Sequence, residues 1–135
     1  MTRHEQRYKA MTILYQAFLY KNNGIVYNID DIINEQLEVK NKFISSLVMG
    51  VINNYQELCN IANKYLDNWE ISRLGFTDQA ILLMGIYEIL NTDTPAITCI
   101  DEAIELSHEY SDEKVCRMIN GVLDKVYHSD KNEEK

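Results

Sequence analysis

The sequence predicts a single all-α domain over residues 1–135, a bundle of six or seven helices. Three observations support this fold class. Apolar residues recur at three- and four-residue spacing through most of the chain, which is the period of one face of an α-helix. One proline and five glycines are too few for the many tight turns of an all-β fold. No segment shows the strict alternation of apolar and polar residues that marks a half-buried strand.

The first predicted helix covers residues 4–21. The stripe that it should bury consists of five large side chains: Tyr8, Met11, Tyr15, Phe18 and Leu19. Its exposed start carries three cations: Arg3, Arg7 and Lys9. Lys21 and Gly24 are stop signals for this helix. A short second helix over residues 29–37 should begin at Asn28 or Asp30, because either side chain can accept hydrogen bonds from the first backbone N–H groups.

The longest predicted helix covers residues 40–65, where apolar residues repeat at near-heptad spacing. Its one irregularity is Gly50, which we interpret as a packing glycine. A short helix over residues 67–73 carries Trp69, and Thr77 is then the expected N-cap of a helix over residues 78–91. That helix is apolar on nearly every side, so we expect protein to surround it.

Pro95 interrupts the helical pattern, and Thr98 with Asp101 resembles a capping box for a helix that ends near residue 110. Ser111 and Asp112 are expected to cap the last helix, residues 115–127, whose apolar residues all fall on one face. Gly121 lies inside this helix, where glycine costs about 1 kcal/mol relative to alanine. We therefore expect Gly121 to make a close helix contact and its neighbour Asn120 a hydrogen bond. Residues 129–135 are charged and aperiodic, which predicts a flexible tail.

Neither the cysteines nor the histidines show the spacing of a chemical site. Cys59, Cys99 and Cys116 are far apart and predict reduced, buried thiols. The three histidines fall in different segments. We therefore predict no catalytic residue, no metal site and no cofactor, and the protein is not expected to be an enzyme. The longest apolar run, residues 80–87, is far below the roughly 18 residues of a membrane span, and no secretory signal is visible, so we expect no membrane association and a cytoplasmic protein.

The net charge of −8 argues against indiscriminate nucleic-acid binding. The charge is unevenly distributed. Residues 1–21 hold four Lys or Arg and one acid, residues 114–131 hold four and two, and residues 22–113 hold four and sixteen. If the two ends meet in space, they form one small basic patch on an acidic body. Such a layout favours a protein that touches a short nucleic-acid segment at one place and another partner elsewhere.

A family signature is recognisable near the carboxyl end, in the run Arg-Met-Ile-Asn-Gly-Val-Leu-Asp-Lys at residues 117–125. It resembles the pattern of the NusB transcription antitermination family, a basic residue, an aromatic, an aliphatic and then Asn-Gly-Val-Leu-Asp. Residues 78–82, 87–90, 95 and 101–106 are also similar to the family in order and spacing, as is the Leu-Tyr-Gln of residues 14–16. The resemblance implies two packed three-helix subdomains, here about residues 1–66 and 77–128.

The resemblance also implies roles for particular residues. The family uses a basic amino-terminal stretch, a tyrosine and the signature itself for RNA, which corresponds here to Arg3, Arg7, Lys9, Tyr65, Arg117 and Met118. Met118 replaces the family's aromatic residue, and it fits the apolar stripe of the last helix equally well. Tyr15 and Asp78 match positions used for the protein partner, the ribosomal protein NusE. For Asp78 the alternative is stabilisation by the helix dipole alone, about 0.3 to 1 kcal/mol.

By resemblance, the expected function is a non-enzymatic transcription adaptor. With NusE it would bind a single-stranded leader RNA element of the boxA type and join the RNA polymerase antitermination complex. Recognition of a single strand is physically reasonable because only unpaired bases expose their edges and faces to a small surface. Two alternatives stay open. One is a protein-only helical interaction module with weak or lost RNA binding. The other is a NusB-like domain of an RNA methyltransferase, although the chain is too short to hold a cofactor-binding domain as well.

Overall fold

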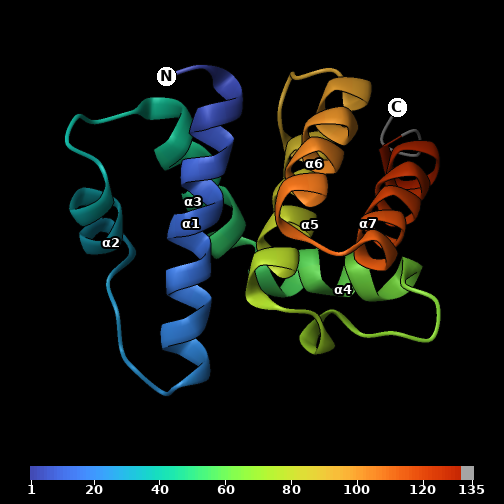
Figure 1. Ribbon diagram of the computed structural model, residues 1–135, viewed down its shortest axis with the longest axis horizontal. Coiled ribbons are helices and arrows are strands. Elements are labelled where there is room, and N and C mark those ends of the chain that lie inside the picture. The colour runs from blue at the N-terminus through green and yellow to red at the C-terminus, as the bar shows by residue number, and fades with distance from the viewer. Residues whose placement is uncertain (132–135) are drawn as a thin grey trace.

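The computed structural model describes residues 1–131 as an all-α fold with no strand, which confirms the predicted class (Figure 1). The elements follow in this order: α1 (Arg3–Asn22), α2 (Ile29–Gln36), α3 (Lys42–Asn53), α4 (Tyr55–Tyr65), the single 3-10 turn η1 (Ile71–Arg73), α5 (Phe76–Asn91), α6 (Ala96–Tyr110), α7 (Glu113–Lys125) and the π-helical turn η2 (Val126–Lys131). None of the described helices is long and apolar enough to cross a membrane.

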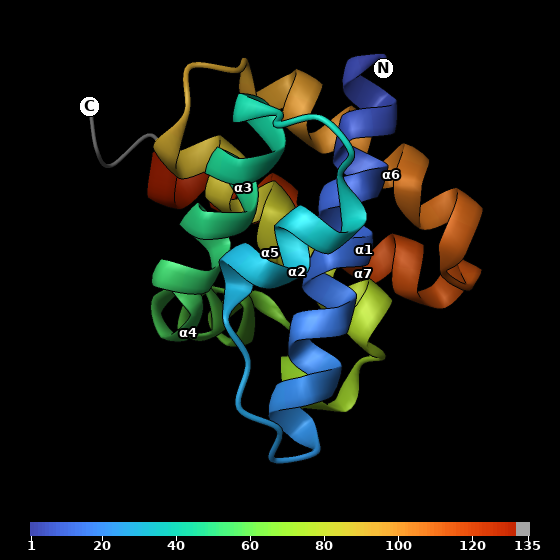
Figure 2. The same cartoon turned by 90° about the vertical axis from the view of Figure 1, so that its left-hand side faces the viewer.

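Helix α5 is the centre of the bundle. Residues 79–86 are all buried, and the helix packs against α1, α3, α4, α6 and α7 (Figures 1 and 2). This arrangement confirms the expectation that residues 78–91 are surrounded by protein. The three cysteines are free and buried, as predicted. Burial raises the pKa of the Cys99 thiol to about 12, so it stays protonated at neutral pH.

The single long helix predicted over residues 40–65 is wrong, because two helices, α3 and α4, form there and Asn54 lies between them. There the backbone leaves helical geometry (φ −114°, ψ 20°), and the Asn54 side chain donates to the carbonyl of Gly50 at 2.8 Å. Apolar spacing continues on both sides of the break, so the pattern alone did not mark it. The predicted helix over residues 67–73 is also wrong. Only the short turn η1 forms there, and Asn68 before it has a positive φ of 56°.

Side-chain caps explain several helix starts. Thr2 and Glu5 form a capping box on α1, and Asn28, Asn41 and Asp112 cap α2, α3 and α7. The expected caps of the two central helices are wrong. The N-cap of α5 is Gly75, which places Thr77 inside the first turn, and α6 begins directly after Pro95, so the residues of the expected capping box lie within the helix.

Glycines at helix contacts are not where the signature suggested. Gly121 is exposed, and a methyl group added there would meet no other part of residues 1–131 within 4 Å, apart from the backbone of its own helix, so the expected close contact is wrong. Gly85 of α5 makes that contact instead, because a Cβ there would lie 2.9 Å from Cδ1 of Leu123 on α7. Gly50 leaves room for the ring of Tyr87, in agreement with its interpretation as a packing glycine.

The final turn extends beyond the predicted last helix. Residues 129–131, assigned to the tail from sequence, are helical, and Asp130 accepts a hydrogen bond from the Tyr65 hydroxyl at 2.5 Å. The rest of the expected tail, residues 132–135, lies outside the described residues. The division into two subdomains stays a prediction: residues 66–75 do link α4 to α5, but α1 packs on α5 as well as on α3.

Candidate nucleic-acid and protein interfaces

Arg7 is not on the surface, so the prediction of an exposed Arg7 is wrong. It is 3% exposed, and its Nε and Nη2 each donate to a carboxylate oxygen of Glu88 on α5 at 2.8 Å. Burial alone would lower the pKa of the Arg7 guanidinium, but the hydrogen bonds and charge of Glu88 outweigh it and raise the pKa. Arg7 therefore holds α1 to α5 and is not available to RNA phosphates.

His4 joins the same helix to α6. Its Nδ1 lies 3.1 Å from Glu102 and its Nε2 lies 3.0 Å from Glu109, with Glu105 at 3.8 Å. The hydrogen bond with Glu102 is the largest cause of a raised His4 pKa. His4, Glu105 and Glu109 are also close enough to hold a metal ion, with ligand atoms within 4.8 Å of one another. Each ring nitrogen of His4 lies within hydrogen-bonding distance of a glutamate, an arrangement that already describes a polar cluster between α1 and α6.

A shallow groove of about 150 Å³ lies between the end of α4 and one face of α7. We call it the α4–α7 groove and define it by six of its lining residues: Tyr65, Asp67, Arg117, Met118, Gly121 and Lys125. Helix α4 lies against α7 (Figure 1). Three of the six residues predicted for RNA from sequence therefore come together in one hollow.

Some signature residues of α7 face this groove or the solvent beside it, whereas Ile119 and Leu123 are buried in the core. Arg117, Asn120 and Gly121 are exposed, whereas Met118 is half-buried and packs on the core. The exposure of Asn120 does not support the buried hydrogen bond expected for it. The conformational cost of Gly121 thus has no packing explanation, and Gly121 lines the groove together with Arg117 and Lys125.

Carboxylates accompany the cations of the groove. Arg117 lies 3.1 Å from Glu113, and Lys125 lies 3.7 Å from Asp67 on the other wall. Such exposed ion pairs contribute only about 0 to 1 kcal/mol, so a phosphate can replace the carboxylate at little cost. The groove therefore offers two cations whose carboxylate partners a phosphate can replace. Beside them lie the partly exposed Tyr65 ring and the Met118 thioether.

Arg3 lies elsewhere, so the condition for one basic patch, that the two chain ends meet in space, is not met. Helices α5 and α6 separate the start of α1 from α7 (Figure 1). Arg3 belongs to a second hollow, of about 550 Å³, beside Lys40, Lys42 and Phe43 at the start of α3. Lys9, two turns along α1, is half-buried and does not line this hollow.

Sequence analysis missed Lys40 and Lys42 because they fall in a stretch whose summed charge is strongly negative. A local signal was available: the Lys-Asn-Lys of residues 40–42 carries two cations around the helix-capping Asn41. The two lysines did not stand out, because charge was summed over the long and mostly acidic segment 22–113. Only the fold reveals that it lies beside Arg3.

The residues predicted for a protein partner lie close together. Tyr15 is 42% exposed and packs edge-to-face on Phe76 in the first turn of α5, with ring centroids 6.3 Å apart. Asp78, in the same turn, accepts a hydrogen bond from Ser111. The exposure of Tyr15 contradicts its placement in the buried stripe of α1, and Tyr8 is also exposed. An aromatic, partly open surface thus joins α1 to the start of α5.

Comparisons with known proteins agree with the resemblance. The model of the NusB family matches residues 4–128. The transcription antitermination protein NusB of Campylobacter jejuni is 36% identical over 126 residues, which cover 91% of this chain and 93% of that protein. The NusB protein of Staphylococcus aureus is 38% identical over 128 residues, covering 93% and 98%.

Solved structures share the fold. NusB of T. maritima superposes with a TM-score of 0.83 at 26% identity and covers 98% of both chains. A chain from a crystal structure of the antitermination factors NusB and NusE in complex with dsRNA gives a TM-score of 0.77 at 25% identity, covering 96% of this chain and 99% of that one. With a family match over nearly all of the described residues and relatives this similar across nine tenths of the sequence, the chain belongs to the NusB family.

Proposed function

We propose that this chain acts in transcription antitermination as a non-enzymatic adaptor that binds boxA-type single-stranded RNA together with a NusE-type ribosomal protein. The names of the relatives support the antitermination role, and a structural neighbour solved with NusE and RNA supports both kinds of partner. In this proposal the paired proteins and RNA would join the RNA polymerase antitermination complex.

The observation that carries the RNA half of the proposal is the α4–α7 groove. Tyr65, Arg117 and Met118 come from two separate helices, yet they line the same hollow. Gly121 also lines this hollow, and its surroundings give no packing reason for a glycine there. Arg3 and Lys9 remain further candidates on α1, whereas the burial of Arg7 removes it from the proposed surface.

The groove residues have complementary roles in this proposal. Arg117 exchanges Glu113 for a phosphate or a base edge, and its five N–H donors suit such bidentate contacts. Tyr65 supplies a ring for an unpaired base, although its hydroxyl is held by Asp130. Met118 offers a thioether in place of a second ring. Since stacking on an aromatic side chain contributes roughly 1 to 3 kcal/mol per base, Met118 should leave binding weaker than an aromatic would.

Tyr15 and Asp78 are the proposed centre of the protein interface. Exposed tyrosine is typical of residues that dominate binding energy, because it buries a large area at a small entropic cost. The end of α6 reaches this region, because Ser111 donates a hydrogen bond to Asp78, and the same helix carries Glu102, Glu105 and Glu109 beside His4. A basic ribosomal protein is therefore electrostatically suited to the surface.

Quantitative mobility-shift titration tests the proposed function. Labelled boxA-type RNA and a scrambled RNA of equal length are titrated with the protein alone, with a NusE-type protein alone, and with both. We expect the two proteins together to bind the boxA-type RNA more tightly than either does alone, and more tightly than the scrambled RNA. No binding by the pair at low salt would contradict the RNA half of the proposal.

One observation favours a second candidate, a protein-only interaction module. The chain carries a net charge of −8, and the cations of the α4–α7 groove already have carboxylate partners. This candidate predicts a stable complex with the NusE-type protein that neither gains nor loses affinity when RNA is added. Because coupling between two ligands is reciprocal, any RNA-dependent gain in partner affinity would exclude it.

A further inference from the structure

The start of α3 carries cations that the proposed RNA groove does not use. We define the α3 platform as Arg3, Lys40, Lys42 and Phe43, which line the hollow between the starts of α1 and α3. Among residues 1–131, no carboxylate lines this hollow. In a chain with a net charge of −8, three cations gathered without an acid among them form a local exception.

These cations differ from those of the α4–α7 groove in being unpaired. Among residues 1–131, none of Arg3, Lys40 and Lys42 lies within 4.0 Å of a carboxylate oxygen, whereas Arg117 and Lys125 each do. A phosphate that reaches the platform therefore does not have to displace an intramolecular partner. On electrostatic grounds, the α3 platform therefore suits a phosphate better than the α4–α7 groove does.

Arg3 is held in place before any ligand arrives. Its guanidinium carbon lies 4.0 Å from the centroid of the Phe43 ring, and its Nη1 donates to Gln6 at 2.9 Å. One face of the guanidinium thus rests on an aromatic ring, while other N–H donors stay available. A fixed guanidinium plane can pair with a phosphate or support a stacked base, at a lower entropic cost than a free arginine.

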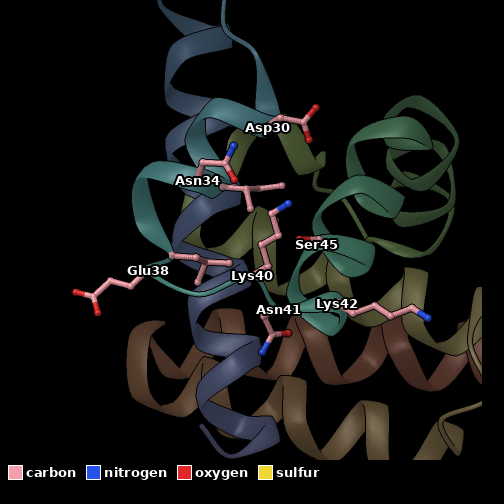
Figure 3. Close-up of a pocket in the computed structure, with 9 residues that line it drawn as sticks. Asp30, Asn34, Glu38, Lys40, Asn41, Lys42 and Ser45 are labelled. Atoms are coloured by element: carbon pink, nitrogen blue, oxygen red, sulfur yellow. The ribbon is translucent and has the colours of Figure 1, made fainter.

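A larger groove of about 830 Å³ between α2 and α3 adjoins the platform and shares Lys40 and Lys42 with it. Figure 3 shows the Lys40 amine reaching into this groove, while Lys42 points away from it. Asn34 and Ser45 offer polar groups in the same groove, and Asp30 and Glu38 stand on its lining. The two carboxylates disfavour a phosphate inside the groove. The Asn34 amide and the Ser45 hydroxyl can still form hydrogen bonds with base edges.

We propose that the α3 platform is a second RNA contact, which holds backbone phosphates of the same single strand that the α4–α7 groove binds. The inference rests on the proposed RNA binding and adds to it a second place on the chain. Unpaired cations and a preorganised guanidinium suit a phosphate backbone, and the neighbouring amides suit unpaired bases. Two separated contacts also require the RNA to be long enough to reach both.

Fluorescence anisotropy with two RNAs tests the proposal. One RNA is a boxA-type core, and the other is the same core extended with unstructured nucleotides at both ends. Both are titrated in the presence of the NusE-type protein at several salt concentrations. The variants are Lys40→Gln, Lys42→Gln and, as a control of equal charge change, Lys21→Gln at the opposite end of α1. All three lysines are exposed, so circular dichroism should show unchanged folding.

We expect Lys40→Gln and Lys42→Gln each to weaken binding of the extended RNA several-fold and to reduce the salt slope by somewhat under one unit, about what the loss of one phosphate contact predicts. Lys21→Gln should change neither quantity. If both platform variants behave like Lys21→Gln on both RNAs while Arg117→Ala weakens binding, the platform inference is overturned and the proposed function stands. If the wild-type protein with its partner binds neither RNA, both are overturned.

Discussion

The junction of α1 with α5 and α6 and the α4–α7 groove use charged residues in opposite ways. At the junction, Arg7 is buried against Glu88 and His4 lies beside glutamates of α6, so these side chains of α1 hold the bundle together. In the groove, Arg117 is exposed and its carboxylate partner is only one turn away. Substitutions at the junction should therefore act on stability, and substitutions in the groove on binding. Neither the residue type nor the match to a family motif distinguishes an arginine that stabilises the fold, such as Arg7, from one that is exposed for binding, such as Arg117.

Breaking the buried ion pair should have the largest effect on stability. We expect Arg7→Met to lower the free energy of unfolding by about 3 to 5 kcal/mol, because it leaves the Glu88 carboxylate buried without its cation. Urea denaturation measures the change. As a control, Arg7→Met combined with Glu88→Leu should recover much of the loss. An Arg7→Met protein as stable as the wild type would show that the pair does not hold α1 to α5.

Two glycines on facing helices give a matched comparison of packing. Gly85→Ala should destabilise by about 1 to 3 kcal/mol through overpacking against Leu123, reduced by the better helix propensity of alanine. Gly121→Ala should stabilise by up to about 1 kcal/mol because nothing lies within 4 Å. Thermal and urea unfolding of both variants decide this prediction. Equal effects would mean that Gly121 is packed as tightly as Gly85.

A change in the groove should alter RNA affinity. Met118→Phe adds a stacking face and should strengthen boxA-type RNA binding by up to about 1 to 3 kcal/mol in the presence of the partner. Met118→Leu, which keeps an apolar side chain of similar size, is the control and should bind as the wild type does. If Phe and Leu bind RNA equally, a base does not meet this position.

The smallest expected effect is a pH dependence of the His4 cluster. Glu102 and the other glutamates raise the pKa of His4 above 6.5, so the folded state holds this proton more tightly than the unfolded state does. The stabilisation is fully present below pH 6.5 and is lost as pH rises through the folded pKa. Urea midpoints of wild type and His4→Gln should therefore differ most at acid pH and converge at higher pH. A difference that grows with rising pH would contradict this assignment.

The fold was predictable because its signals are local and repeated. Apolar spacing alone indicated that residues 78–91 are surrounded by protein, and side-chain chemistry placed Asn28 and Asp112 among the expected caps. The break at Asn54 was not predictable in this way, since the same apolar period runs through α3 and α4. The backbone there is redirected by a side-chain hydrogen bond, which leaves no mark on periodicity.

The candidate site was predictable only in part, because exposure depends on distant residues. Arg7 resembles Arg3 in sequence, one turn away on the same helix, yet Glu88 lies 81 positions further along the chain and removes Arg7 from the surface. The family signature lies on α7, but it could not indicate that Gly121 is exposed and that Gly85 makes the close contact. Lys40 and Lys42 became visible only once α3 was placed beside α1.

The most direct test of the distinction between junction and groove is a nuclear magnetic resonance titration of ¹⁵N-labelled protein, bound to unlabelled NusE-type protein, with boxA-type RNA. Our account predicts that backbone amide signals shift at residues 65–67 and 117–125, whereas those around Arg7 and Glu88 stay in place. Shifts gathered around Arg7 and Glu88, with the α4–α7 groove unaffected, would contradict it.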